Sequence, residues 1–378
     1  MMRMKTGIVV LMLTWAAPAV AVEHLTIRHD GQQLRISGRE VVTAEDGGIL
    51  LLARDGMLWA VPPDEQLKHT SDEQPFQPYA ADELGKRLLA ELPQGFDVHR
   101  TAHYVICFDT SRAYAQWCGS LFERLYLAFT NFWGHKGFTL SEPEFPLVAT
   151  VFADKRAYLK YSEPVLGAAG GSIIGYFNLN SNRMVMYDLT GSESSGRSRR
   201  IGTSAQINQV LARPEALQTV ATIVHEATHQ IAFNCGLHTR LSDCPVWFSE
   251  GIAVYFETPD LSSAKGWRGV GNVNRTRLEQ FQQYLRTRPT DSLESLIARD
   301  TRFRDTRKAL DAYAEAWSLT YFLLRQHADR YVSYLKLLSQ KKPLLQDGPA
   351  KRVEQFEGVF GNLKTLDAEF VRSMGRAR

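Results

Sequence analysis

The hydrophobic pattern of the chain changes once along its length, and this change constrains the fold more than any other feature. Short runs rich in β-branched and apolar residues fill residues 24–62 and return between residues 103 and 188. Such runs, separated in the first stretch by Asp-Gly and Gly-Gly pairs, are typical of strands. From Pro214 onward, apolar residues instead recur at helical spacing. A small β unit, further strands and then helices predict an α+β fold with a helical C-terminal half.

The middle part of the chain predicts one helix and four strands. Residues 111–133 place apolar side chains at helical spacing, namely Tyr114, Trp117, Leu121, Leu125 and Phe129. HYVICFD (103–109) and FPLVATVFAD (145–154) are apolar enough for buried strands. GSIIGYFNLNSNRMVMYD (171–188) predicts two strands joined by an Asn-Ser-Asn turn, which is a hairpin.

The first 21 residues have the organisation of a cleaved export signal. The positively charged MMRMK precedes an apolar stretch, GIVVLMLTWAA, that is too short to span a bilayer comfortably. Ala19-Val20-Ala21 then supplies the small residues that a signal peptidase requires, so we expect cleavage after Ala21. The sequence therefore predicts a mature protein that is exported to a periplasm or to the medium and does not insert in the membrane.

Charge and composition narrow the partners and the domain plan. The formal net charge is +3 and no basic stripe is present, so nucleic acid is not an expected partner. The polar, proline-containing stretch KHTSDEQPFQPYAADE (68–83) predicts a linker. We therefore expect a signal peptide at 1–21, a small β unit with its linker at 22–80 and a larger domain at 81–378.

The four cysteines take their meaning from the expected export. In an oxidising compartment, cysteines that are close in sequence form disulfides by default, which favours Cys107–Cys118 and Cys235–Cys244. The alternative for the second pair is a structural zinc site with Cys235, His238 and Cys244 as ligands. A Cys235–Cys244 disulfide would close the loop between the two predicted helices that carry the residues described next.

The segment VHEATHQ (224–230) has the clearest chemical meaning. His225 and His229 are four residues apart, so on a helix both imidazoles point from one face towards a common ion. Glu226 flanks that face, where its carboxylate reaches water beside the metal without being a ligand. A catalytic zinc usually takes three protein ligands, and Glu250, in a following predicted helix, is the candidate for the third. A surface glutamate on an amphipathic helix is the alternative interpretation of Glu250.

Together, HEATHQ (225–230) and PVWFSEGIAVYFE (245–257) resemble the gluzincin branch of the zincin metallopeptidases. Within that clan the chain is more similar to an uncharacterised bacterial family of exported proteins with a domain of unknown function. VFADKRAYLKYSE (151–163), the expected hairpin and YAEAWSLTYFLL (313–324) agree with this likeness. The resemblance implies a thermolysin-like core, in which a small mixed sheet packs on the helix that bears the two histidines.

The resemblance also assigns roles to single residues. His225, His229 and Glu250 would ligate Zn²⁺, and Glu226 would act as the general base. Zinc lowers the pKa of its bound water, Glu226 takes the proton, and the hydroxide attacks a carbonyl before the proton passes to the leaving amine. The expected function is therefore zinc-dependent cleavage of peptide bonds in exported peptides or proteins.

The resemblance implies two further parts of the site. Related aminopeptidases stabilise the oxyanion with a tyrosine downstream of the metal motif, and Tyr313 is the candidate here. Tyr255 and Tyr321 are weaker candidates, and a core aromatic on an amphipathic helix is the alternative for Tyr313. In the same clan an edge strand beside the zinc helix pairs with the substrate backbone. Ile173–Asn178 or Met184–Tyr187 is the expected equivalent.

Two departures from the gluzincin pattern stand out. Thermolysin-like enzymes often carry an acidic residue four positions after the third ligand, where it contacts a ligand histidine, and here that position is Val254. Glu257 or Glu315 is the expected substitute. The exopeptidase signature Gly-x-Met-Glu-Asn is missing from the sequence, which favours an endopeptidase.

Two other functions are compatible with the sequence. One is a non-catalytic envelope protein that keeps the fold and a metal but binds a partner. The other is an amidase that acts on cell-wall cross-links. The intact Glu226 favours hydrolysis over binding, because a binding module has no need for a general base.

Overall fold

The structure is a computed structural model and describes residues 21–190, 203–258, 261, 267 and 269–378. The expected signal segment lies outside the described residues except for Ala21, which begins the first strand. The chain forms two compact units. The first contains the described residues up to Arg54 together with Leu58–Pro78, and the second contains Asp55–Met57 and Tyr79–Arg378. The secondary structure is of the α+β class, as expected.

The first unit is a five-stranded antiparallel sheet with strand order β4-β3-β2-β1-β5. Its elements are β1 (Ala21–His29), β2 (Gln32–Thr43), β3 (Ile49–Ala53), β4 (Leu58–Val61), the short 3-10 helix η1 (Pro63–Glu65) and β5 (Gln66–Pro75). A small apolar core on one face of the sheet contains Leu25, Ile27, Ile36, Ile49, Leu51 and Val61. The strands expected in residues 24–62 are therefore confirmed.

The expected linker is wrong in its first half, because Gln66–Pro75 forms strand β5. This strand pairs with β1, for example His24 with Thr70 and Thr26 with Lys68. β5 lies at the edge of the sheet, and its side chains are mostly polar and exposed. An edge strand without a buried face lacks the apolar alternation by which strands are predicted from sequence.

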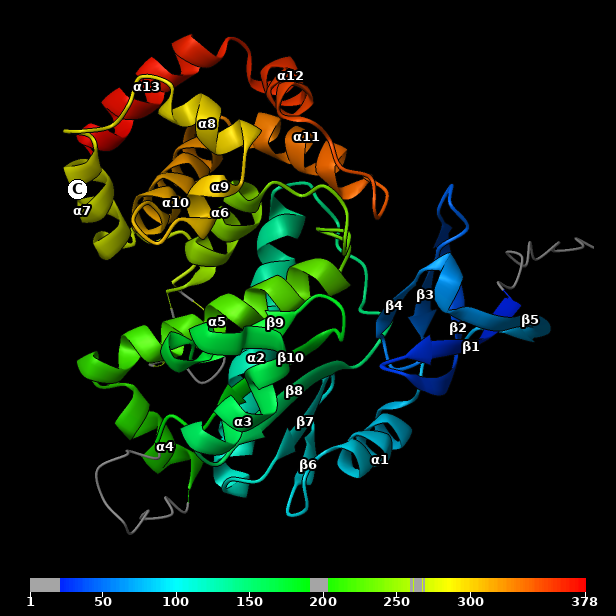
Figure 1. The fold of residues 1–378 in the computed structure, drawn as a ribbon. Helices are drawn as coiled ribbons and strands as arrows, with labels where there is room; N and C mark the ends of the chain where they lie inside the picture. Colours follow the sequence, from blue (N-terminus) through cyan, green and yellow to red (C-terminus); the bar gives the residue numbers. More distant parts are fainter. Residues whose placement is uncertain (1–20, 191–202, 259–260, 262–266, 268) are drawn as a thin grey trace, which may run out of the picture. The chain divides into compact units, whose positions relative to one another are not determined.

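The second unit is built around a mixed sheet with strand order β6-β7-β8-β10-β9 (Figure 1). Its strands are β6 (Asp97–Arg100), β7 (Tyr104–Phe108), β8 (Leu147–Phe152), β9 (Gly175–Asn178) and β10 (Arg183–Tyr187). β7, β8 and β10 are parallel, whereas β6 and β9 run antiparallel to their neighbours. The pairing of β9 with β10 confirms the expected hairpin. β9 is an edge strand, and β10 is not.

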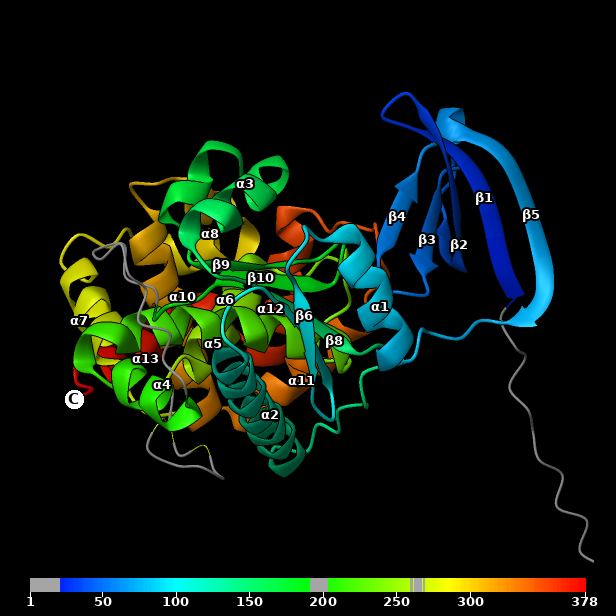
Figure 2. The same cartoon turned by 90° about the horizontal axis from the view of Figure 1, so that it is seen from below.

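Helices cover both faces of this sheet (Figure 2). α1 (Ala81–Glu91) and α3 (Lys155–Leu166) pack on one face, and the short 3-10 helix η2 (Gly167–Ser172) follows α3. α2 (Arg112–His135) and α5 (Pro214–Asn234) pack on the other, with α4 (Ser204–Leu211) beside them. The five residues expected to form the apolar stripe of α2 are all buried. The strongest helical pattern in the middle of the chain therefore forms one wall of the main core.

All four cysteines are free thiols in the structure, so the expected disulfides are wrong. Side chains alternate along β7, and Cys107 packs on the α1 face of the sheet. Cys118, on α2, is buried in the core on the opposite face, so the sheet separates this pair. Cys235 is buried at the end of α5, whereas Sγ of Cys244 lies 3.7 Å from Nδ1 of His238. Closeness in sequence does not bring either pair of thiols together.

The C-terminal half of the second unit is helical, as expected (Figure 1). It contains α6 (Val246–Phe256), α7 (Arg275–Tyr284), α8 (Ser292–Ala298), α9 (Thr301–Arg304), α10 (Ala309–Gln326), α11 (Ala328–Ser339), α12 (Pro349–Phe360) and α13 (Leu363–Gly375). α10 packs against α6, α7, α9, α11 and α13 and is the central helix of this half. None of the helices in the described ranges has both the length and the apolar character needed to cross a membrane.

A very close helix contact lies where α6 meets α10. A Cβ atom added at Gly251 would overlap the carbonyl oxygen of Ala316 and the hydroxyl of Thr320. Tyr313, Ala316 and Thr320 are three and four residues apart, so they share the face of α10 that meets α6. The glycine next to Glu250 thus allows α10, with Tyr313, to lie directly against the helix that carries the third expected ligand.

Candidate metal centre

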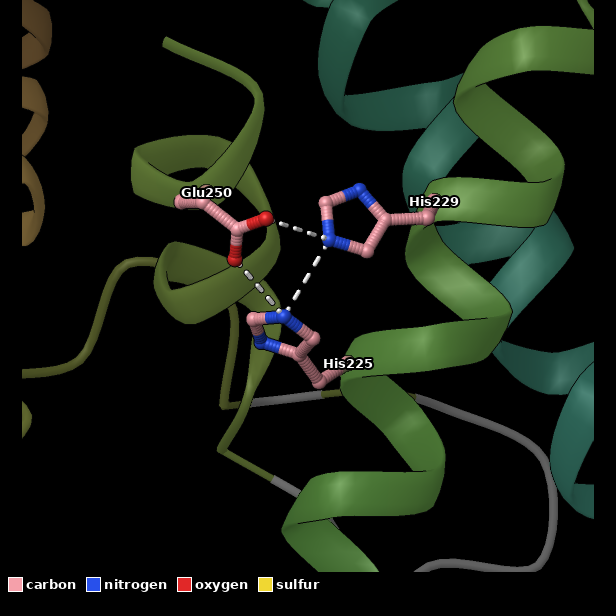
Figure 3. A group of neighbouring side chains, drawn as sticks. All are labelled: His225, His229 and Glu250. Atoms are coloured by element: carbon pink, nitrogen blue, oxygen red, sulfur yellow. Dashed lines mark hydrogen bonds and ion pairs between the residues drawn. The ribbon is translucent and has the colours of Figure 1, made fainter. Parts of the chain in front are cut away.

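Helix α5 buries one stripe of side chains and offers another to α6. The buried stripe consists of Val220, Val224, Ala227 and Ile231. The helix ends at Asn234, just before Gly236, whose φ of 79° is the left-handed conformation that commonly follows a helix. His225 and His229 lie one turn apart on the stripe that faces α6 (Figure 3). The amphipathic packing of α5 therefore fixes the direction of both imidazoles.

Three side chains meet between α5 and α6 (Figure 3). Nε2 of His225 lies 3.1 Å from Nε2 of His229. The carboxylate of Glu250 faces both rings, with Oε2 3.0 Å from Nε2 of His225 and Oε1 3.4 Å from Nε2 of His229. All three side chains are 12–16% exposed. The structure brings together the three residues expected as metal ligands, and no other such group occurs in the described part of the chain.

The spacing of these atoms suits a zinc ion. Zinc bonds of about 2.0–2.2 Å at tetrahedral angles separate neighbouring ligand atoms by roughly 3.3 Å. The two imidazole nitrogens lie 3.1 Å apart and face different oxygens of Glu250 at 3.0 and 3.4 Å, so each neighbouring pair of donor atoms is close to that value. Two imidazoles and one carboxylate are also a ligand set typical of catalytic zinc, which keeps a further position open. Both the geometry and the chemistry of the donors fit the metal expected from the sequence.

The charges of the three groups depend on one another. Burial by itself lowers the pKa of His225, but the hydrogen bond and the charge of Glu250 outweigh it and raise the pKa to about 9. Burial alone would raise the pKa of Glu250, yet the charge of His229 and the hydrogen bonds from both histidines outweigh it and lower the pKa below the usual carboxyl range. A proton and a metal ion therefore compete for Nε2 of His225.

Glu226 is held by the edge of the sheet. Its Oε2 accepts a hydrogen bond of 2.9 Å from the backbone N–H of Phe177, in β9. Burial raises the pKa of Glu226, and the charges of the two histidines and this hydrogen bond only partly oppose the rise. A carboxylate with a raised pKa is a better proton acceptor near neutral pH. Of the two expected edge segments, Ile173–Asn178 lies beside Glu226, and Met184–Tyr187 is interior to the sheet.

Of the three candidate tyrosines, the structure brings Tyr313 to the site. The negative charge of Glu250 is the largest cause that raises the pKa of Tyr313, and burial and the charge of Glu226 add to it. Tyr255 and Tyr321 face each other instead, with ring centroids 6.4 Å apart. Burial is the main cause that raises the pKa of Tyr255, to about 12. Tyr313 is therefore the candidate tyrosine whose pKa responds most to the charges of the site.

Glu257 and Glu315, the two expected substitutes for an acidic residue at position 254, differ in their surroundings. Glu257 is 8% exposed, burial raises its pKa, and the charge of His225 opposes the rise. Oε2 of Glu257 has no hydrogen-bond partner among the described residues. Glu315 is wrong as a candidate, because Arg288 and Arg302 each contact it at 2.7 Å in a separate buried cluster. Glu257 is therefore the acidic neighbour of the three ligands.

The alternative zinc site near the cysteines does not form. Nδ1 of His238 contacts Sγ of Cys244, but Cys235 does not join them. His238 is 3% exposed, and burial, with a smaller effect of the charge on His229, lowers its pKa to about 3. Its ring packs against Phe233, with centroids 5.2 Å apart. His238 is thus a neutral aromatic residue behind the metal centre.

Two contacts beside the site were not predicted from the sequence. Phe177 contributes a backbone N–H to Glu226, and no side-chain pattern reports such a contact. Arg277, in the first turn of α7, has its guanidinium carbon 5.6 Å from the centre of the Tyr313 ring. A cation in the first turn of a helix opposes the helix dipole. Arg275 in the same turn shares this feature, so the sequence holds no signal that separates Arg277 from it.

Comparisons with known proteins agree with part of the expected resemblance. The sequence profile of a family described as "Protein of unknown function (DUF1570)" matches residues 219–345. The matched segment contains the three expected ligands together with Glu226 and Tyr313. A comparison with curated proteins gives no match. The likeness to a family of unknown function is supported, and an activity has to be argued from the chemistry of the site.

Proposed function

We propose that this protein is a zinc-dependent hydrolase that cleaves peptide bonds of exported peptides or proteins. The observation that carries the proposal is the convergence of His225, His229 and Glu250 within 4.8 Å, next to the half-buried carboxyl group of Glu226. This set corresponds to the ligands and the base of the gluzincin pattern. Bound there, zinc supplies a Lewis acid that polarises a carbonyl group and makes water more acidic. The export signal expected at residues 1–21 favours substrates outside the cytoplasm.

Glu226 is the base in this proposal. The N–H of Phe177 engages Oε2, which leaves Oε1 of the same carboxylate to accept a proton from the attacking water. Burial raises the pKa of Glu226, which makes its carboxylate a stronger proton acceptor than an exposed one. The same carboxyl group then returns the proton to the amine that leaves, so the base is restored at the end of the cycle.

Two further groups of the chain take part in the proposed reaction. The hydroxyl of Tyr313, whose pKa responds first to the charge of Glu250, donates a hydrogen bond to the carbonyl oxygen as negative charge develops on it. The outer edge of β9 pairs with an extended substrate backbone. Because Phe177 of β9 also holds Glu226, a substrate on this edge is aligned with the base.

Zinc content and turnover together test the proposal. The full chain and its Glu226→Gln variant are loaded with zinc, and hydrolysis of a mixed peptide library is followed by mass spectrometry. We expect one zinc per chain in both proteins, because Glu226 is not among the three converging ligands. Turnover should fall by about 10²- to 10⁴-fold in the variant, which is the usual contribution of a general base.

Glu279→Gln is the matched control, since Glu279 is an exposed residue of α7. It should keep both the zinc and the turnover of the parent chain. A zinc-loaded parent that leaves every peptide intact would contradict the peptidase and favour the non-catalytic binding protein. Turnover on cell-wall cross-links alone would favour the amidase.

A further inference from the structure

Arg277 lies beside the candidate metal centre on a second helix. It is the third residue of α7, and its backbone N–H is capped by the side chain of Asn274. The side chain is half-buried, with the guanidinium carbon 5.6 Å from the centre of the Tyr313 ring. The same ring packs edge-on against Phe303, with centroids 5.2 Å apart. Tyr313 therefore has a defined orientation, and Arg277 covers it.

One aromatic ring separates Arg277 from the expected metal ligands. α10, which carries Tyr313, packs against both α6 and α7. The charge of Glu250 raises the pKa of Tyr313 most, and the charge of Arg277 opposes that rise. Arg277 and His225 likewise both oppose the rise in the pKa of Glu257 that burial causes. The guanidinium thus acts on the same groups as the metal centre and borders the same site.

The charge of Arg277 has no ion-pair partner in the part of the chain that the structure describes. Glu257 is the carboxyl on which it acts, yet Oε2 of that group has no hydrogen-bond partner there either. Arg288 shows the contrast, since it contacts both Glu315 and Asp367 at 2.7 Å and 2.5 Å. Charges in partly buried positions are usually paired. An arginine left without a carboxylate next to a candidate catalytic site is suited to bind an anion from outside the chain.

The helix that carries Arg277 adds to the positive potential at this place. The first turn of α7 contains no acidic residue. Unpaired backbone N–H groups at a helix N-terminus favour negative charge, and a cation among them is unfavourable for the helix alone. Arg277 therefore weakens α7 by a small amount while it strengthens the attraction of the site for an anion. No ion pair of Arg277 within the described structure compensates for this destabilisation of α7.

We propose that Arg277 binds a carboxylate of the peptide substrate, close to the bond that is cleaved. The inference rests on the proposed peptidase function and names the class of peptide on which it acts: peptides with an acidic group beside the scissile bond. The carboxylate comes either from the C-terminus of a short peptide or from an Asp or Glu side chain. Both sources offer two oxygens that match the fork of the guanidinium group.

Peptide binding to a chain that cannot turn over tests this proposal. Zinc-loaded Glu226→Gln protein is titrated with four fluorescent hexapeptide pools of equal mixed composition. Two pools differ only in a free or amidated C-terminus, and two differ only in Glu or Gln at the central positions. Each titration is repeated after Arg277→Met, after Arg277→Gln and after Arg275→Met, which removes an exposed arginine of the same turn as a control.

We expect one carboxylate pool to bind about tenfold or more tightly than its neutral counterpart, a ratio typical of a charge-assisted hydrogen bond. The ratio should fall to about one in both Arg277 variants and stay unchanged in Arg275→Met. The pair of pools that shows the ratio identifies the C-terminus or the side chain as the source. Equal binding of all pools, no binding of any pool, or a ratio that survives both substitutions would overturn the proposal.

The outcome is separable from that of the proposed function. A carboxylate preference that depends on Arg277, in a protein whose Glu226-intact form cleaves nothing, would refute the hydrolase and leave the binding role intact. Cleavage by the parent chain without any such preference would refute the role of Arg277 alone. A KM that rises in Arg277→Met for the acidic peptides only, with kcat nearly unchanged, is the kinetic counterpart of the binding result.

Discussion

Two partly buried polar clusters lie near helix α6, and they differ in their balance of charge. The paired cluster consists of Asp243, Asp300, Lys341 and Arg352 and lies at the start of the helix. The metal-centre cluster consists of His225, Glu226, His229, Glu250 and Glu257 and lies one turn further on. In the first, every charge faces an opposite charge. In the second, acidic groups and imidazoles converge, and no Lys or Arg of the described ranges forms an ion pair with them.

The paired cluster holds α6 in place. Arg352 contacts Asp243 at 2.6 Å and Asp300 at 3.0 Å, and Lys341 contacts Asp243 at 2.9 Å. Oδ1 of Asp300 also accepts a hydrogen bond of 3.1 Å from the backbone N–H of Val246, the first residue of α6. α6 has no side-chain cap of its own, so this contact replaces it. The two clusters therefore differ in role. The balanced charges of the paired cluster join helices, whereas the unbalanced donors of the metal-centre cluster are available to a cation.

The largest effect is expected from a substitution that disrupts the metal-centre cluster. Replacing His225 with Ala removes one of three ligands, so zinc should be lost and turnover should fall by roughly 10³-fold or more, since the Lewis acid is lost with it. Metal analysis after dialysis and the peptide-library assay measure both quantities. The circular dichroism spectrum should match the parent. Full zinc content in the variant would mean that Nε2 of His225 does not bind the ion.

The second largest effect is expected from a substitution that disrupts the paired cluster. Arg352→Met leaves the buried Asp243 and the half-buried Asp300 without their main counter-charge, and the unfolding free energy should drop by about 3–5 kcal/mol. Urea denaturation of the zinc-free chain measures the change. Lys351→Met is the control, because Lys351 makes only a surface pair with Glu354 and should shift stability by less than about 0.5 kcal/mol. Equal losses in the two variants would argue against a special role of the buried charges.

The smallest expected effect concerns pH and separates charge from packing in the paired cluster. Burial alone would raise the pKa of Asp243, but Arg352 and Lys341 outweigh it and lower the pKa below the ordinary 3.8. A carboxyl group with a depressed folded pKa adds stability above its unfolded pKa and loses it as pH falls through the folded value. The stability difference between the parent and Arg352→Met should therefore be widest near neutral pH and narrow below about pH 4. Urea midpoints measured from pH 7 to pH 3 decide this, and a constant difference would assign it to packing.

The three expected metal ligands could be predicted from the sequence, but the contacts that surround and hold them could not. The spacing of His225 and His229 on a helix depends only on local geometry, and Glu250 lies in a recognisable motif, PVWFSEGIAVYFE, of the next helix. The choice between Glu257 and Glu315 required the structure, because the sequence does not show that Arg288 and Arg302 pair with Glu315. Arg352 and Asp243 are 109 residues apart, and no periodicity or motif reports a pair at that separation.

The same division applies to the fold. Segments with a buried face were predictable, since burial imposes a period on the sequence, and strands β1 to β4 of the first unit, α2 and α5 are the examples. β5 was not predictable, because its side chains face solvent and its pairing with β1 is made by the backbone. The prediction of the disulfides was wrong for a related reason. Proximity in sequence suggested Cys107–Cys118, but the alternation of β7 places them on opposite faces of the sheet.

The contact at Gly251 limits which side chains this position can accommodate. A methyl group at this position would need the space that the Ala316 carbonyl and the Thr320 hydroxyl occupy. Alanine at 251 would therefore require both a smaller side chain at 320 and a shift of the α10 backbone at Ala316. The distance between the helix of Glu250 and the helix of Tyr313 thus depends on the absence of a single methyl group.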